Sequence, residues 1–120
     1  VQPVVELIAG LSVDPQFGPV VVAGIGGIFV EVMKDVQLRL PPLDLEEATA
    51  MLGCLRGAPL LGGARGRPEA DVAAAAAALV ALGELALDLG DRLVALDVNP
   101  LFVLPKGQGV LAGDALLELR

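Results

Sequence analysis

The sequence contains no histidine and only one cysteine, Cys54. Without imidazole, this stretch of chain supplies no histidine metal ligand, no histidine general base and no phosphohistidine. A lone cysteine excludes an internal disulfide and fits a reducing, cytoplasmic compartment. The chemistry of the chain must therefore rest on carboxylates, amides, backbone groups and a few cations.

Basic residues are also few, with 8 Lys and Arg against 15 Asp and Glu, a net charge of −7 and a pI near 4.3. Nucleic acids and anionic membranes bind basic faces, so we expect neither as a partner. The chain is 55% hydrophobic, but its two longest apolar runs, 18–30 and 72–83, fall short of the roughly 20 residues of a membrane span. We therefore predict one tightly packed domain over residues 1–120 rather than a membrane protein.

The amino-terminal residues form a strand-like run that begins at Val1 without a basic segment before it. This start does not resemble a signal peptide. A start without Met inside an apparent strand suggests a fragment of a longer, multidomain polypeptide.

The order of the predicted elements is strands, then two helices, then strands. Apolar periodicity predicts strands at 4–13, 20–25, 37–40, 94–98, 101–104 and 109–112, and a strand-like segment at 28–36. It predicts one helix that begins at Asp44 and a second from about Asp71 to Leu89. This order favours an α+β fold, a mostly antiparallel sheet with the helices packed on one face.

The two helices have recognisable starts and buried faces. Asp44 and Glu47 have the spacing of a capping box, and Gly57 is expected to end that helix. Cys54, beside the apolar side of this helix, is expected to be a small buried residue. In the second helix a 3-4 repeat predicts the buried stripe Val72, Ala75, Leu79, Leu82, Ala86 and Leu89.

The glycine-rich sequence Gly24-Ile25-Gly26-Gly27 follows a valine-rich strand and raises the question of a dinucleotide-binding loop. Phe29 stands where that motif needs its third glycine, and the following residues favour a strand instead of a helix. Local chemistry therefore favours a hairpin turn. Glu31 is a carboxylate among apolar residues, either on a solvent-facing side of its strand or paired in a site.

Asp97 and Asn99 lie two residues apart in a predicted strand, so both side chains point to the same face. An antiparallel pairing through 101–109 would bring Asp114 close to them. Carboxylate and amide oxygens are the ligands that Mg²⁺ prefers, with phosphate and water completing its shell. The Asp-x-Asn-Pro spacing alone, however, favours ordinary turn chemistry.

Three segments taken together resemble a known family. They are 5–44, which includes "GIGGIFVEVMKDVQLRLPPLD", then "LLGGARGRP", then "LDVNPLFVLPKGQGVLAGDA". In order and spacing they resemble the carboxy-terminal part of the ATP-grasp domain of NDP-forming acyl-CoA synthetases, a family that includes ADP-forming acetate–CoA ligase and is related to the succinyl-CoA synthetase β subunit. The resemblance covers nearly all of the chain and implies an ATP-grasp lobe that binds ATP or ADP and Mg²⁺.

The resemblance also implies roles for individual residues. Asn99 and Asp114 match the positions of Mg²⁺ ligands, and Asp97 matches a catalytic position that meets a phosphohistidine. Glu6 and Glu31 match acidic positions near the nucleotide cleft, and Gly26-Gly27 matches a glycine pair in a loop that faces the cleft. Coenzyme A would be bound by other domains or subunits of the parent synthetase.

The sequence departs from the family in two ways. Leu116 stands where many relatives have arginine, which puts a charge partner at the end of that strand in doubt. The phosphohistidine carrier and the amino-terminal nucleotide-binding lobe are outside these residues, so we expect the isolated chain to be inactive. Arg56, Arg65 and Arg67 could meet a phosphate, coenzyme A or another domain, and their local chemistry slightly favours plain surface contacts.

Two functions remain open at this point. The first is the metal-holding lobe of an acyl-CoA synthetase that forms acyl-CoA from a carboxylic acid, CoA and ATP. The second is a non-catalytic regulatory or scaffolding module, for example in a GNAT-fused protein acetyltransferase.

Overall fold

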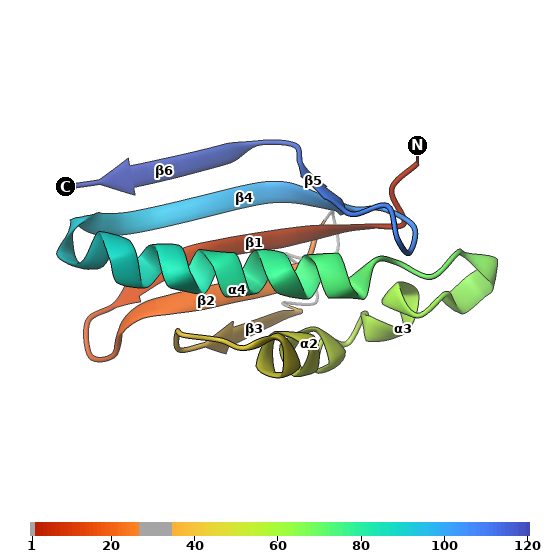
Figure 1. Ribbon diagram of the computed structural model, residues 1–120, viewed down its shortest axis with the longest axis horizontal. Helices are drawn as coiled ribbons and strands as arrows, with labels where there is room; N and C mark the ends of the chain where they lie inside the picture. Colours follow the sequence, from red (N-terminus) through yellow and green to blue (C-terminus); the bar gives the residue numbers. More distant parts are fainter. Residues whose placement is uncertain (1, 27–34) are drawn as a thin grey trace.

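The computed structural model describes residues 2–26 and 35–120, arranged as one sheet with helices packed against it (Figure 1). The strands are β1 (Val5–Asp14), β2 (Gly18–Ile25), β3 (Val36–Arg39), β4 (Leu93–Val103), β5 (Val110–Ala112) and β6 (Ala115–Leu119). The helices are α2 (Leu45–Gly53), α3 (Ala58–Leu61) and α4 (Val72–Leu89), with 3₁₀ turns η1 (Ala64–Gly66) and η2 (Gly90–Arg92).

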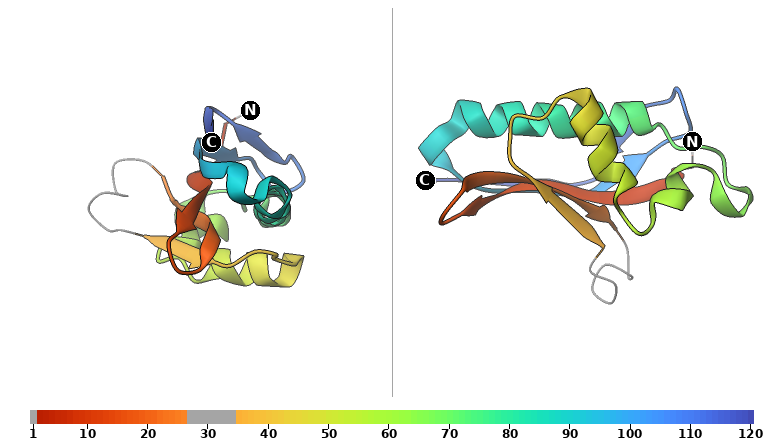
Figure 2. Two further views of the ribbon diagram at one scale, coloured as in Figure 1. Left: turned by 90° about the vertical axis from the view of Figure 1, so that its left-hand side faces the viewer. Right: turned by 90° about the horizontal axis from the view of Figure 1, so that it is seen from below.

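The sheet has the strand order β3-β2-β1-β4-β5, with β6 also paired to β4, and these pairs are antiparallel. Figure 2 shows α2 and α4 on the same face of this sheet. The predicted α+β class and the one-sided helix layer are therefore confirmed. The core lies between the layers and includes Leu7, Leu11 and Val21 from the sheet and Met51 and Leu79 from the helices.

The other side of the sheet carries the side chains that alternate with these core residues. We call it the open face and define it by residues of β1 (Glu6, Ile8, Gly10, Ser12), β4 (Asp97, Asn99) and β6 (Leu116). Glu6, Asp97, Asn99 and Leu116 are exposed. The open face therefore collects the polar groups that the sequence singled out on these strands.

Helix α2 begins as predicted, with a capping box in which the Asp44 carboxylate accepts a hydrogen bond from the Glu47 N–H at 2.7 Å and Glu47 bonds back to the Asp44 N–H at 3.2 Å. The helix ends earlier than predicted, at Gly53, with Cys54 as its C-cap. Gly57 instead precedes α3 as its N-cap. The expected burial of Cys54 is wrong: it is exposed at the C-cap of α2, and the next residue, Leu55, enters the core instead.

Buried Asp35 explains this early end. Its carboxylate accepts hydrogen bonds from the Arg56 N–H at 2.6 Å and the Gly57 N–H at 2.8 Å, which fixes a turn where the helix would otherwise continue. A Cβ at Gly57 would lie only 2.7 Å from Cγ1 of Ile25, so this close approach to β2 requires glycine.

Helix α4 covers the centre of the sheet. Asp71 is its N-cap, and Ala75, Leu79 and Ala86 from the predicted stripe are buried. The remaining stripe residues are partly buried against the core. The segment Val72–Arg92 is long and apolar enough, by length and composition, to cross a membrane, with a hydropathy of 1.9. About 28% of the apolar window is buried, on the side of α4 that packs against the sheet.

The carboxy-terminal strands differ from the prediction in two places. The strands predicted at 94–98 and 101–104 are one strand, β4, which continues through Asn99-Pro100. β6 was not predicted, and it forms because its residues pair with β4 from Leu93 to Val98. The predicted strand-like segment 28–36 lies almost wholly outside the described residues.

Candidate functional site

The candidate site lies on the open face at the centre of β4. Asp97 and Asn99 are exposed while Val98 between them is buried, so the two polar side chains share the open face as predicted. The Asn99 N–H donates to the Asp114 carbonyl oxygen at 3.1 Å. Asp114 therefore lies directly across from Asn99, between β5 and β6.

The strand register places the Asp114 side chain on the same face. Val98 pairs with Ala115 and Asp97 pairs with Leu116, so Asp114, two residues before Leu116, alternates onto the open face. Residues directly opposite in an antiparallel pair have their Cβ atoms about 4.5–5.5 Å apart. The side chains of Asn99 and Asp114 are thus on the same face, and Asp114 Oδ1 accepts a hydrogen bond from the Ala115 N–H at 2.9 Å.

Asp97 lies between a glycine and a leucine. Gly10 is its neighbour on β1, and Leu116 is its neighbour on β6. A Cβ at Gly10 would collide with the Leu96 carbonyl oxygen, so glycine is required for β1 and β4 to approach here. Neither neighbour offers a charge, and the side of Asp97 toward Gly10 carries no side chain.

Glu6 and Gly26 lie together at the start of β1. The Gly26 N–H donates to the Glu6 carbonyl oxygen at 2.7 Å, and Glu6 pairs with Phe102 of β4. A Cβ at Gly26 would lie 3.0 Å from that carbonyl oxygen, which favours glycine at this position. Glu6 shares the open face with the β4 residues. Gly27 and Glu31, the other predicted cofactor-binding residues, lie outside the described residues.

The donor chemistry of the site suits a hard divalent cation. Within residues 2–26 and 35–120 no three His, Cys, Asp or Glu side chains form a metal cluster, so a cation here would rely on the amide of Asn99 as well as carboxylates. Mg²⁺ commonly takes one or two protein oxygens and completes its shell with phosphate and water. Asn99 and Asp114 fit that pattern.

Two buried carboxylates were not among the functional residues predicted from the sequence. Asp35 and Asp71, 6% and 9% exposed, both accept several backbone N–H groups. Asp71 bonds to Ala74 in α4 and to Gly107 and Gly109 in the β4–β5 turn. Its position before the alanine tract signalled a helix start, but nothing in the sequence signalled the bonds to the turn.

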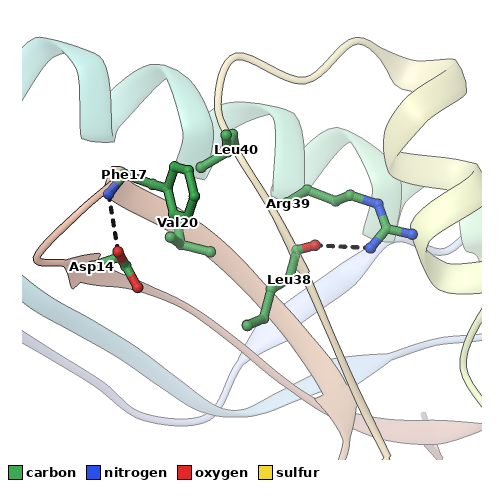
Figure 3. Close-up of a pocket in the computed structure, with 6 residues that line it drawn as sticks. All are labelled: Asp14, Phe17, Val20, Leu38, Arg39 and Leu40. Carbon is green, nitrogen blue, oxygen red and sulfur yellow. Dashed lines mark hydrogen bonds between the residues drawn. The ribbon is translucent and has the colours of Figure 1, made fainter.

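One groove lies away from these residues. It has a volume of about 330 Å³ and lies between the β1–β2 turn and the end of β3. Figure 3 shows Phe17, Val20, Leu38 and Leu40 gathered around it, while the Arg39 guanidinium points away to the Leu38 carbonyl oxygen. This apolar groove is at the opposite end of β1 from Glu6 and contributes nothing to the polar site.

Known proteins share both the sequence and the fold. Residues 1–119 match the ATP-grasp domain family. The β subunit of ADP-forming acetate–CoA ligase II from Pyrococcus furiosus is 41% identical over 115 residues, which cover 96% of this chain and 49% of that protein. The ADP-forming 4-hydroxybutyrate–CoA ligase of Nitrosopumilus maritimus is 39% identical over 95% of this chain and 16% of its own length.

The fold agrees with these relatives. Acetyl-coenzyme A synthetase 1 of Ca. Korarchaeum cryptofilum, solved with coenzyme A and Mg-AMPPCP, superposes with a TM-score of 0.91 and 39% identity over 100% of this chain and 55% of that chain. The chain thus spans about half the length of the β-subunit relative and of this solved neighbour. With its antiparallel sheet and one-sided helices, the chain belongs to the ATP-grasp domain family, and it resembles the ADP-forming acyl-CoA synthetases along nearly its whole length.

Proposed function

We propose that this chain is the nucleotide- and Mg²⁺-binding lobe of an ADP-forming acyl-CoA synthetase, which makes acyl-CoA from a carboxylic acid, CoA and ATP. The observation that carries the proposal is that Asn99 of β4 and Asp114, between β5 and β6, lie opposite each other on one face. The relatives are ligases, which favours an enzyme over the regulatory module. The remaining domains or subunits of the parent protein would supply CoA binding and the rest of the nucleotide cleft.

Asn99 and Asp114 would hold Mg²⁺ through their side-chain oxygens. When bound, the ion neutralises charge on the nucleotide phosphates during phosphoryl transfer. Asp97, two residues from Asn99 on the same face, would orient an incoming phosphohistidine through its carboxylate. The empty side of Asp97 above Gly10 leaves room for such a group to approach.

Glu6 and Gly26 would border the nucleotide on the same face. The hydrogen bond from the Gly26 N–H to the Glu6 carbonyl oxygen fixes the start of the β2–β3 connection. Gly27 and Glu31 belong to this proposed cleft by resemblance. Glu6 is exposed and Gly26 is partly exposed, which fits a surface that a second lobe would cover.

The test is a calorimetric titration of ADP into the full-length protein with and without Mg²⁺. Asn99→Ala and Asp114→Ala should each remove most of the gain in affinity that Mg²⁺ provides, by about tenfold or more, because each loses a metal ligand. Affinity for ADP without Mg²⁺ should change little, since the nucleotide contacts remain.

Glu84→Gln is the matched control, because Glu84 is an exposed carboxylate on α4, the helix that packs on the other side of the sheet. Like Asp114→Ala, Glu84→Gln removes one negative charge, but it should leave the gain in ADP affinity from Mg²⁺ unchanged. If Asn99→Ala and Asp114→Ala both keep the wild-type Mg²⁺ response, the metal assignment is wrong.

A further inference from the structure

Asp71 is a buried carboxylate that joins a helix start to a distant hairpin turn. One oxygen, Oδ1, accepts the Ala74 N–H at 3.1 Å and caps α4. The other oxygen, Oδ2, accepts the Gly107 N–H at 3.1 Å and the Gly109 N–H at 2.8 Å. Asp71 is only 9% exposed, yet all three bonds go to backbone groups. The residue therefore connects two parts of the backbone and has no direct part in the proposed chemistry.

The turn that Asp71 holds has a defined shape. The Gln108 N–H donates to the Pro105 carbonyl oxygen, and the Leu104 N–H donates to the Gly109 carbonyl oxygen. Gly107 and Gly109 have φ angles of +86° and +89°, which favour glycine. Main-chain bonds from Asp71 to Leu104 and from Lys106 to Glu69 add to the attachment. The turn is thus fixed to the start of α4 at several points.

The turn sets a register that continues without a shift to the candidate metal ligand. Val103 pairs with Val110, and Leu101 pairs with Ala112. The Gly113 N–H then donates to the Pro100 carbonyl oxygen, and the Asn99 N–H donates to the Asp114 carbonyl oxygen. A slip of two residues would move Asp114 by about 6.6 Å along β4, and a slip of one would turn it to the other face.

We propose that Asp71 is a positioning residue for the metal site, holding the β4–β5 turn on α4 so that Asp114 stays opposite Asn99. The metal in this inference rests on the proposed function, whereas the strand register is observed directly in the structure. The hydrogen bonds to Asp71 also favour its charged form. Hydrogen bonds from the Gly109 and Ala74 N–H groups lower the pKa of Asp71 against the effect of burial, and the Gly107 N–H and Lys106 lower it further.

Two substitutions in the full-length protein separate the two roles of Asp71, which caps α4 and binds the β4–β5 turn. Asp71→Ser keeps a good N-cap for α4 but is too short to reach the turn. Asp71→Asn keeps a side-chain oxygen for Ala74 but has an amide nitrogen, which accepts no hydrogen bond, for Gly107 and Gly109. Glu69→Gln is the control, because its Oε2 makes only an exposed ion pair with Lys106 at 3.6 Å.

The first readout is hydrogen exchange of peptides that cover 96–101, compared with peptides from β1 and β2. Asp71→Ser should speed exchange at the Asn99 amide about fivefold or more, while exchange in β1 and β2 stays within about twofold. The second readout is the gain in ADP affinity that Mg²⁺ provides. In Asp71→Ser this gain should fall on the order of tenfold, the smallest effect that is typical when a group supporting a metal ligand is lost. Glu69→Gln should change neither.

The outcomes are separable. If exchange at Asn99 and the Mg²⁺ response stay wild-type in both Asp71 variants, the inference is overturned while the proposed function stands. Faster exchange at Asn99 with an unchanged Mg²⁺ response also overturns it, because register would then not govern the metal. If Asn99→Ala and Asp114→Ala themselves leave the Mg²⁺ response intact, the proposed function fails first.

Discussion

Gly113 gives the sharpest test of how the site is built. It lies between β5 and β6, and its N–H donates to the Pro100 carbonyl oxygen at 2.8 Å. A Cβ added there would lie 2.8 Å from Cε2 of Phe102 and 3.0 Å from Cγ of Pro100. Gly113→Ala should therefore push the β5–β6 junction away from β4. This displacement would occur beside Asn99 and Asp114.

The expected cost follows from these distances. Ordinary van der Waals contacts begin near 3.4 Å, so both contacts are too close by roughly half an ångström. The Phe102 ring can move, but the Pro100 ring is fixed to the backbone of β4. Overpacking of this kind costs about 1–3 kcal/mol, and a partly exposed position falls near 1–2. At roughly 3–6 °C per kcal/mol for a domain of this size, that lowers Tm by roughly 3–12 °C.

The assay is thermal unfolding of the full-length protein followed by titration with Mg²⁺ and ADP. Gly53→Ala is the control, because a Cβ at Gly53 meets nothing within 4 Å and alanine favours the end of α2. Its Tm should stay level or rise. A Gly113→Ala protein that melts within about 1 °C of wild type and keeps its Mg²⁺ response would refute the reasoning.

Four further results are expected. Asp44→Ala removes the capping box of α2 and should lower the free energy of unfolding by about 1 kcal/mol in a denaturant titration. Leu79→Ala empties a fully buried position and should cost about 3–4 kcal/mol by the same measurement. The pKa of Asp71 is lowered by backbone N–H groups, so its stabilising effect is present above about pH 4 and is lost as pH falls through its folded value; Asp71→Asn should flatten this part of the acid unfolding curve. Leu116→Arg places a cation opposite Asp97 and should keep the free energy of unfolding within about 1 kcal/mol of the wild-type value in the same denaturant titration.

Much of the fold could be predicted from periodicity, and the failures have local physical causes. The apolar, β-branched start of β1, the Asp44 capping box and the 3-4 stripe of α4 all led to the observed elements. β6 has the sequence Ala-Leu-Leu-Glu-Leu, which favours a helix by propensity and forms a strand only because β4 offers it a partner.

Pro100 misled the prediction of β4 for another reason. Proline lacks the N–H of a regular ladder, so the sequence indicated a break after Asn99. In the fold the Pro100 carbonyl oxygen still accepts the Gly113 N–H, and the pairing of β1 with β4 shifts register between Leu7 and Ala9. The irregularity is absorbed inside the sheet, so the strand continues.

The candidate site was only half predictable. A period of two puts Asp97 and Asn99 on one face, and an antiparallel return through 101–109 brings Asp114 near them, as predicted. The exact register of that return, however, is fixed by no local pattern. That register depends on Asp71, 36 residues before Gly107 in the chain. A helix start and a hairpin turn are each visible in the sequence, yet the hydrogen bonds between them exist only once α4 lies on the sheet.

The position of Asp114 follows from constraints on both sides of it. On the β5 side, the turn held by Asp71 fixes the pairing of Val103 with Val110. On the β6 side, Val98 pairs with Ala115. Asp114 lies between these two pairings, and a slip of one residue would turn its side chain to the other face. Exposed side chains can thus be held in fixed positions by backbone pairing, which is how an open sheet face can present ordered ligands to a cation.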